Sequence, residues 1–237
     1  MKYTDPTAYD GRTHKPEEKY IHSLWDAILR KTINKYISTR ATVCDLGCGT
    51  LEHTQHMSMA ARIIAIDTST AMLEGGQPKI AHLQHKITLL AEDALHTSLP
   101  ASTCDVIWTV GLSEYVNLNE LWQEISRLAK NPATVIIQFP NKQSSYNLII
   151  SSLKYILGQK SKQFRTLQEM DSTSGTYGWR RRSFISCGMI LPLPASLAPL
   201  GTHIWPILEK ICAPLQAFYP IGLNVLAVYE RRGAPTT

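Results

Sequence analysis

The sequence contains only five cysteines, and no two of them form a C-x-x-C pair. An odd and scattered set of this kind predicts neither a disulfide framework nor a zinc site. The histidines show no metal-ligand spacing either, so we expect no metal centre. The first residues lack the basic stretch followed by an apolar stretch that marks a cleaved secretion signal. Together these features predict a cytoplasmic protein in a reducing compartment.

Long uninterrupted hydrophobic runs are missing as well. Residues 183–208 carry no formal charge, but four prolines interrupt them, which excludes a membrane-spanning helix. Glycine and proline number only 13 each among 237 residues, and 44% of the chain is hydrophobic. This composition excludes collagen-like and largely disordered chains and is sufficient for a buried core.

The excess of positive over negative charge is confined to one region. The chain carries a net charge of +5, yet residues 142–182 contain eight basic and two acidic side chains, so the remainder is slightly acidic. A solvated insertion is the interpretation that this segment favours, ahead of a patch for an anionic ligand or a membrane surface.

Hydrophobic periodicity predicts strands that alternate with helices. We expect helices over 16–38, 53–61, 69–73, 119–130, 179–187 and 204–217, and strands over 41–45, 62–67, 87–91, 104–110, 133–139, 189–193 and 224–229. Alternation of this kind implies crossover connections. The predicted fold class is therefore α/β, a doubly wound, Rossmann-like, seven-stranded and mostly parallel sheet with helices on both faces. An N-terminal helix and an insertion after the fifth strand complete it.

A glycine turn follows the first predicted strand, in the run Asp45-Leu46-Gly47-Cys48-Gly49-Thr50. Alternate glycines there let the backbone approach a ligand closely. A dinucleotide-binding turn would have a further glycine three positions after Gly49, where this chain has Glu52. Asp45 would also repel a phosphate and would favour a ligand that carries an ammonium group.

Two further acids follow later strands. Asp67 lies 22 residues after Asp45, near the spacing at which an acid holds ribose hydroxyls in doubly wound folds. Asp93 follows the third predicted strand, where its carboxylate is suited to accept a hydrogen bond from the exocyclic amine of adenine. Three acids at successive strand ends thus predict a crevice for an adenosine that bears a positively charged amino-acid tail.

These residues resemble the successive motifs of class I S-adenosylmethionine-dependent methyltransferases. The resemblance rests on the glycine turn, Ile66-Asp67-Thr68-Ser69 with Ala71-Met72-Leu73, Glu92-Asp93-Ala94 with Leu99-Pro100, and Cys104-Asp105-Val106-Ile107. It covers roughly residues 40–140, while the remainder matches only in the order of its strands and helices. It implies one methyltransferase domain over 1–237, with an N-terminal lid or helix (1–40), a cofactor-binding core (41–140), an insertion or acceptor cap (141–183) and C-terminal strands (184–237).

The same resemblance implies S-adenosyl-L-methionine as cofactor and assigns its contacts residue by residue. Asp45, Gly47 and Gly49, with Cys48 in the same turn, would surround the methionine part, and Asp67 would hold the ribose. Thr68 and Met72 would flank the adenine, Asp93 and Ala94 would recognise its amine, and Gly111 would approach the sulfonium. The one departure is Leu51, which stands where the family often has a third glycine.

Methyl transfer from a sulfonium requires mainly an aligned acceptor and exclusion of water, so a general base is optional. The candidates for such a base are Glu114, Tyr115 and His14. Tyr9, Tyr115, Asn141, Tyr146 and Tyr177 are the residues that we expect to line an acceptor site. The sequence assigns the role of general base to none of these residues.

The acceptor class follows from what stands after the fourth strand. The run Val110-Gly111-Leu112-Ser113-Glu114-Tyr115 lacks the Asn/Asp-Pro-Pro-aromatic pattern of enzymes that methylate exocyclic nitrogens of bases. We therefore predict methylation of oxygen or nitrogen on a small, partly apolar metabolite such as a natural product, a quinone or lipid-like molecule, or a sugar conjugate. A peripheral membrane contact, an RNA methyltransferase that uses the basic segment, and a non-catalytic partner that binds the same cofactor remain the alternatives.

Overall fold

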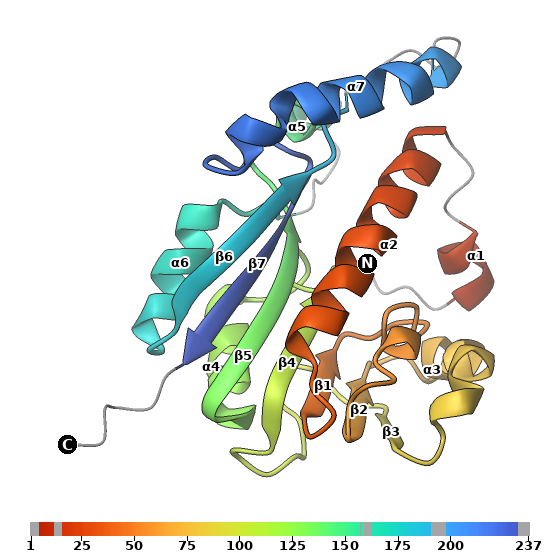
Figure 1. The fold of residues 1–237 in the computed structure, drawn as a ribbon, viewed down its shortest axis with the longest axis vertical. Helices are drawn as coiled ribbons and strands as arrows, with labels where there is room; N and C mark the ends of the chain where they lie inside the picture. The colour runs from red at the N-terminus through yellow and green to blue at the C-terminus, as the bar shows by residue number, and fades with distance from the viewer. Residues whose placement is uncertain (1–4, 12–15, 157, 159–162, 191–197, 232–237) are drawn as a thin grey trace.

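The computed structural model describes residues 5–11, 16–156, 158, 163–190 and 198–231. Its centre is one seven-stranded sheet in the order β3-β2-β1-β4-β5-β7-β6 (Figure 1). The strands are β1 (Thr42–Leu46), β2 (Arg62–Ile66), β3 (Ile87–Leu90), β4 (Cys104–Val110), β5 (Ala129–Pro140), β6 (Arg180–Cys187) and β7 (Asn224–Arg231). The predicted seven-stranded fold is confirmed.

Five strands are parallel, and their carboxyl ends meet at one edge of the sheet. The pairs Leu46↔Ile66 and Ile66↔Leu90 align the last residues of β1, β2 and β3. Strand β7 is antiparallel to both of its neighbours, so β6 runs in the same direction as β5. Residues that follow β1 to β5 are therefore brought to one edge, which is where ligands bind in open α/β sheets.

Helices cover both faces of the sheet. They are α1 (Pro6–Asp10), α2 (Pro16–Tyr36), α3 (Thr70–Gly76), α4 (Leu118–Leu128), α5 (Ser145–Ile156), α6 (Leu167–Thr176) and α7 (Ala198–Gln216), with 3₁₀ segments η1 (Thr54–His56) and η2 (Gln77–Leu83). One core packs α4 and α6 on the sheet around Trp122, and the other packs α2, α3 and η2 on the opposite face around Ile33. The sheet is thus buried on both sides, as its apolar strands require.

Two predicted helices are wrong. The segment 179–187 forms β6, an edge strand that pairs with β7. Backbone pairing outweighs local preference there, and the three exposed arginines Arg180, Arg181 and Arg182 protect the free edge. The segment 53–61 forms only the short η1, because its chain returns directly to the start of β2.

Smaller corrections concern element boundaries. Strand β5 begins at Ala129, inside the helix predicted over 119–130, and α4 ends at Leu128. Met189 and Ile190 lie outside any strand, which corrects the strand predicted over 189–193, whose last three residues lie outside the described part of the chain. Helix α7 is longer than predicted and contains Pro206 and Pro214. None of the described helices combines the length and apolar character needed to cross a membrane.

Candidate functional site

The glycine turn leaves β1 at the carboxyl edge of the sheet. Gly47 and Gly49 adopt positive φ angles of 74° and 53°, a conformation that glycine adopts at little cost. The backbone amides of Gly47 and Cys48 both donate to the carbonyl of Ile66, which joins the turn to the end of β2. An ideal Cβ on Gly49 would lie 3.7 Å from Met72 and 3.8 Å from Tyr9, so the glycine keeps a narrow passage open.

Leu51 also has a positive φ, of 60°. This is the position where the resembling family often has glycine, and the backbone here does take the left-handed conformation that glycine favours. The Leu51 side chain is fully buried in the core beside Met57. It therefore fills the core and leaves the cleft open.

Asp67 follows β2 and faces the glycine turn. Its carboxylate accepts hydrogen bonds of 2.9 Å from the amides of Gly49 and Ser69. Ser69 in turn caps α3 by accepting from the amide of Met72. The Asp67 carboxylate is thereby held in one orientation at the cleft, with lone pairs left for a ligand.

Asp45 is buried beneath the turn. It is 3% exposed, and its Oδ2 accepts a 2.6 Å hydrogen bond from the Thr54 hydroxyl. Burial raises the pKa of Asp45 to about 7; the Thr54 hydrogen bond lowers it, while the nearby Asp67 raises it further. Asp45 and Cys48 are not among the described lining residues of the cleft, in contrast to the contacts expected for them.

The loops that follow β3 and β4 line the side of the cleft opposite the glycine turn. Asp93 is exposed and accepts from the amide of Leu95, while Ala94 is buried. The Gly111 amide donates to Oε1 of Gln138, whose Nε2 donates to Oδ1 of Asn224. This chain of amides ties the ends of β4, β5 and β7 together.

These segments enclose a cleft of about 630 Å³, here called the glycine cleft. Its volume is in the range of small-ligand sites. Eight of the ten predicted cofactor residues line it, together with Tyr9, Glu114 and Tyr115. The eight are Gly47, Gly49, Asp67, Thr68, Met72, Asp93, Ala94 and Gly111.

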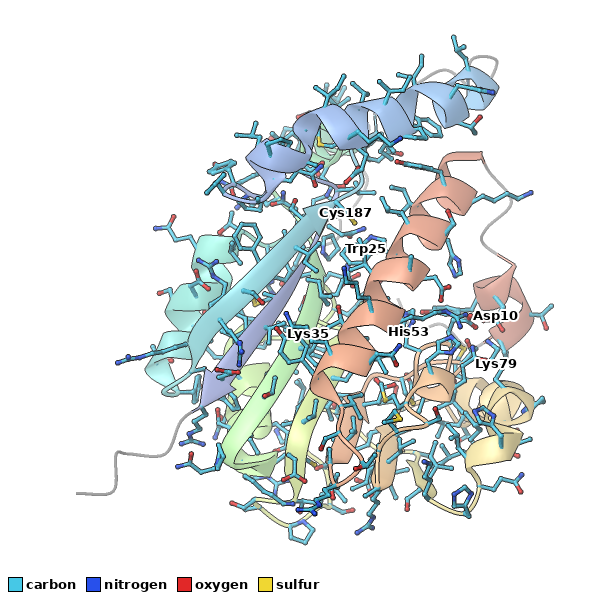
Figure 2. The ribbon with its side chains drawn as sticks, in the orientation of Figure 1. Asp10, Trp25, Lys35, His53, Lys79 and Cys187 are labelled. Carbon is cyan, nitrogen blue, oxygen red and sulfur yellow. The ribbon has the colours of Figure 1, made fainter. Side chains whose placement is uncertain are left out.

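Helix α1 closes the cleft through a cluster around Lys79. The Lys79 ammonium donates to Asp10 at 2.8 Å, to Glu52 at 2.7 Å and to the Thr50 hydroxyl at 3.2 Å. Figure 2 shows Asp10 and Lys79 side by side where α1 meets α3 and η2. The cluster joins α1 to the glycine turn, which places Tyr9 over Gly49.

A second cleft of about 570 Å³ lies beneath α1 and α2, and is called here the helical cleft. It shares Tyr9 and Val110 with the glycine cleft, so the two are neighbours. Ile21, Trp25 and Leu29 give it an apolar wall from α2, and Gln138 and Asn224 form its floor. Its other lining residues are Asp10, Glu18, His22, Asp26, Glu52 and His53.

His53 is the unusual group of the helical cleft. Burial lowers its pKa to about 4, so the imidazole is neutral at physiological pH. Its Nδ1 is buried without a hydrogen-bond partner among the described residues. Figure 2 places His53 between α2 and α1, with Trp25 further along the inner side of α2. A ligand in the cleft would be positioned to satisfy this nitrogen.

Not every expected acceptor residue reaches a cleft. Tyr9 lines both clefts, but Asn141 is fully buried and donates to the carbonyls of Pro220 and Gly222, so it holds a turn. The Tyr177 hydroxyl donates to the carbonyl of Asn119, in the first turn of α4. Tyr146, on α5, is not among the residues described as lining either cleft. His14 lies outside the described residues.

The sequence matches one family model, described as a methyltransferase domain, over residues 43–132. That segment runs from β1 to the start of β5 and contains the whole glycine turn and the three strand-end acids. Over that segment the chain is similar to a methyltransferase domain. No curated protein sequence matches it.

Solved structures of methyltransferases are similar to this chain over most of its length. A possible histamine N-methyltransferase from Thermotoga maritima has a TM-score of 0.60 at 14% identity, covering 86% of this chain and 87% of its own. A geranyl diphosphate C-methyltransferase from Streptomyces coelicolor, bound to Mg²⁺, geranyl diphosphate and S-adenosyl-L-homocysteine, has a TM-score of 0.61 at 16% identity, with coverages of 91% and 83%.

A third similar structure is the complex of the Haloferax volcanii Trm112 methyltransferase activator with a protein described as a methyltransferase. It has a TM-score of 0.60 at 17% identity and covers 85% of this chain and 86% of its own. At these identities the likeness shows the fold. The class I methyltransferase fold predicted from the motifs is confirmed.

Proposed function

We propose that the glycine cleft binds S-adenosyl-L-methionine and that the chain transfers its methyl group to oxygen or nitrogen of a small, partly apolar metabolite in the helical cleft. The observation that carries this proposal is the junction of the two clefts at Tyr9 and Val110. A cofactor pocket that opens into an acceptor pocket is what a two-substrate transfer needs.

The residues of the glycine cleft fit the cofactor. An added Cβ at Gly111 would meet nothing within 4 Å, which leaves space for a ligand at the end of β4. We assign the ribose hydroxyls to Asp67, the adenine to Thr68 and Met72, and its amine to Asp93 with Ala94. When bound, S-adenosyl-L-methionine supplies an activated methyl group on a sulfonium. Asp45 acts from below the turn through its charge, since its side chain is buried.

The lining of the helical cleft indicates the chemistry of the acceptor. Trp25 and its apolar neighbours on α2 suit the apolar part of an acceptor. Four carboxylates line the same cleft, and its described lining residues include no lysine or arginine. Lys79 neutralises part of that charge through Asp10 and Glu52, and Arg30 pairs with Asp26. The balance disfavours an anionic acceptor. The described lining comes from the N-terminal helices and the strand ends, with no contribution from 141–183, so the proposed acceptor cap is α1 with α2.

We assign to His53 the removal of the acceptor proton. The neutral imidazole accepts the proton of an O–H or N–H group while the new bond to the methyl carbon forms and the carbon–sulfur bond breaks. The sulfur keeps the electron pair of the broken bond, so charge and atoms balance. Glu114 and Tyr115 line the glycine cleft instead.

Methyl transfer can be tested with methyl-labelled S-adenosyl-L-methionine and a protein-free cell extract. We expect label in the small-molecule fraction, and a rate that falls about 100-fold in His53→Gln with unchanged cofactor affinity. The matched control is His85→Gln, because His85 is exposed and lies outside both clefts. An equal loss in both variants would contradict the role given to His53.

The same experiment separates the alternatives. Label in RNA would favour an RNA methyltransferase, and cofactor binding without label in any fraction would favour a non-catalytic partner. The structure gives the basic segment other contacts: Arg181 pairs with Asp171, Arg182 with Glu230, and Arg165 donates to backbone carbonyls. Side chains engaged in this way are less available for phosphates.

A further inference from the structure

An apolar surface covers the outer sides of α5 and α7. Ten of the thirteen large hydrophobic side chains that are exposed in the described residues belong to α5, α7 or the two residues Phe218 and Tyr219. Their exposed fractions reach 86% at Tyr155, 85% at Phe218 and 77% at Ile156. So many exposed apolar side chains on two helices and the residues that follow α7 indicate an interaction site.

Helix α7 has two apolar sides. Trp205 faces inward, 1% exposed, and packs against Tyr20 of α2 with ring centroids 5.8 Å apart. Ile207, Ile211 and Leu215 recur every four residues on the opposite side and are all more than half exposed. A helix that only covered its own core would carry polar residues on that side.

The charges of this surface have one sign. Glu209 is the one acid of α7, and it is turned inward: its carboxylate accepts from the amides of Gly188 and Met189 and from Gln216. Lys210 is exposed on the same helix. In the sequence, Lys154 is the one charged residue of α5.

The surface lies on the same side of the molecule as the clefts. Helix α5 follows the carboxyl end of β5, and both α5 and α7 lie beyond that edge of the sheet (Figure 1). The Gln143 amide donates to the Tyr219 hydroxyl at 2.7 Å, which connects the segment before α5 to the segment after α7. A layer that contacts this surface would therefore lie beside the helical cleft.

We propose that α5 and α7 dock the protein on an anionic lipid bilayer, with their apolar side chains in the interface and Lys210 at the headgroups. Amphipathic helices with single-sign basic charge bind membranes in this manner. Tyrosine suits the interfacial zone, because its ring is apolar and its hydroxyl can stay in water. The docking stands apart from methyl transfer, but it would bring the helical cleft close to acceptors dissolved in the bilayer.

Vesicle flotation tests the proposal with the full chain. We expect the protein to float with phosphatidylcholine vesicles that contain about one third phosphatidylglycerol, and much less with phosphatidylcholine alone. Ile211→Glu should lower the partition coefficient at least about 10-fold, and Lys210→Ala about 5-fold. Met59→Glu is the matched control, since Met59 is 48% exposed but lies before β2, away from this surface.

Three results would overturn the proposal. They are no flotation of the wild type, equal binding by Ile211→Glu, and a wild-type dimer that Ile211→Glu converts to a monomer without any vesicle binding. The last result would assign the surface to a second copy of the chain. Thermal unfolding and cofactor binding of each variant, measured in parallel, distinguish a failed docking surface from a failed methyltransferase assignment.

Discussion

Replacing Asp67 by alanine should weaken S-adenosyl-L-methionine binding at least about 100-fold, because two hydrogen bonds from ribose to a charged acceptor are lost. The Asp67 carboxylate already accepts from the amides of Gly49 and Ser69, which fixes its orientation. Titration calorimetry of the variant against the wild type measures the change. The largest single loss of affinity in the glycine cleft is expected here.

Two further variants separate ligand binding from a structural role of Asp67. Asp67→Asn keeps an acceptor for one of the Gly49 and Ser69 amides, so its melting temperature should fall less than that of Asp67→Ala while its affinity remains low. Asp105→Asn is the matched control, because Asp105 lies at the start of β4 and binds the Thr42 amide and Lys130. Normal cofactor binding by Asp67→Ala would disprove the ribose assignment.

Replacing Asp45 by asparagine should stabilise the cofactor-free protein at pH 8. The folded-state pKa of Asp45, about 7, exceeds the ordinary value of 3.8, because burial opposes ionisation. Its contribution to stability is therefore complete below pH 3.8 and is lost as the pH rises to 7. The gain of the variant should be small at pH 4 and should reach roughly 4 kcal/mol at most above pH 7.

Denaturant unfolding of both proteins from pH 4 to 8 measures this difference. Asparagine preserves an acceptor for the Thr54 hydroxyl, so the comparison isolates the charge. The ionised carboxylate should also attract the cationic tail of the cofactor, so wild-type affinity should rise through pH 7 and that of Asp45→Asn should not. Parallel stability curves for the two proteins would show that Asp45 ionises without a burial cost.

The glycine cleft could be predicted from the sequence because its residues follow strand ends in chain order. Each of Gly47, Asp67 and Asp93 comes just after an apolar run, and parallel strands bring such positions to one edge. The edge strand β6 could not be predicted in the same way. Its conformation depends on pairing with β7, about 40 residues later in the chain, and not on local preference.

The helical cleft had almost no sequence signal. Its lining comes from four segments that lie far apart in the chain, and only folding brings them together: they contribute Tyr9, Trp25, His53 and Asn224. The ion pair of Asp10 with Lys79 likewise joins residues 69 positions apart. One usable signal was Gln138, a polar residue near the end of the apolar strand β5, where it binds the Gly111 amide. Asn141 was expected to line the acceptor site, but its side-chain amide donates to the carbonyl of Pro220 in a buried turn.

Calorimetric binding of S-adenosyl-L-methionine and S-adenosyl-L-homocysteine, with a nicotinamide dinucleotide as control, tests the central claim most directly. Asp67 and Asp93 line the glycine cleft, Asp45 is buried beneath its turn, and the sequence has Glu52 where a dinucleotide turn needs glycine. We therefore predict micromolar binding of the two sulfur nucleosides and none of the dinucleotide. Binding of the dinucleotide, or of no ligand in this set, would contradict the proposal that this cleft serves methyl transfer.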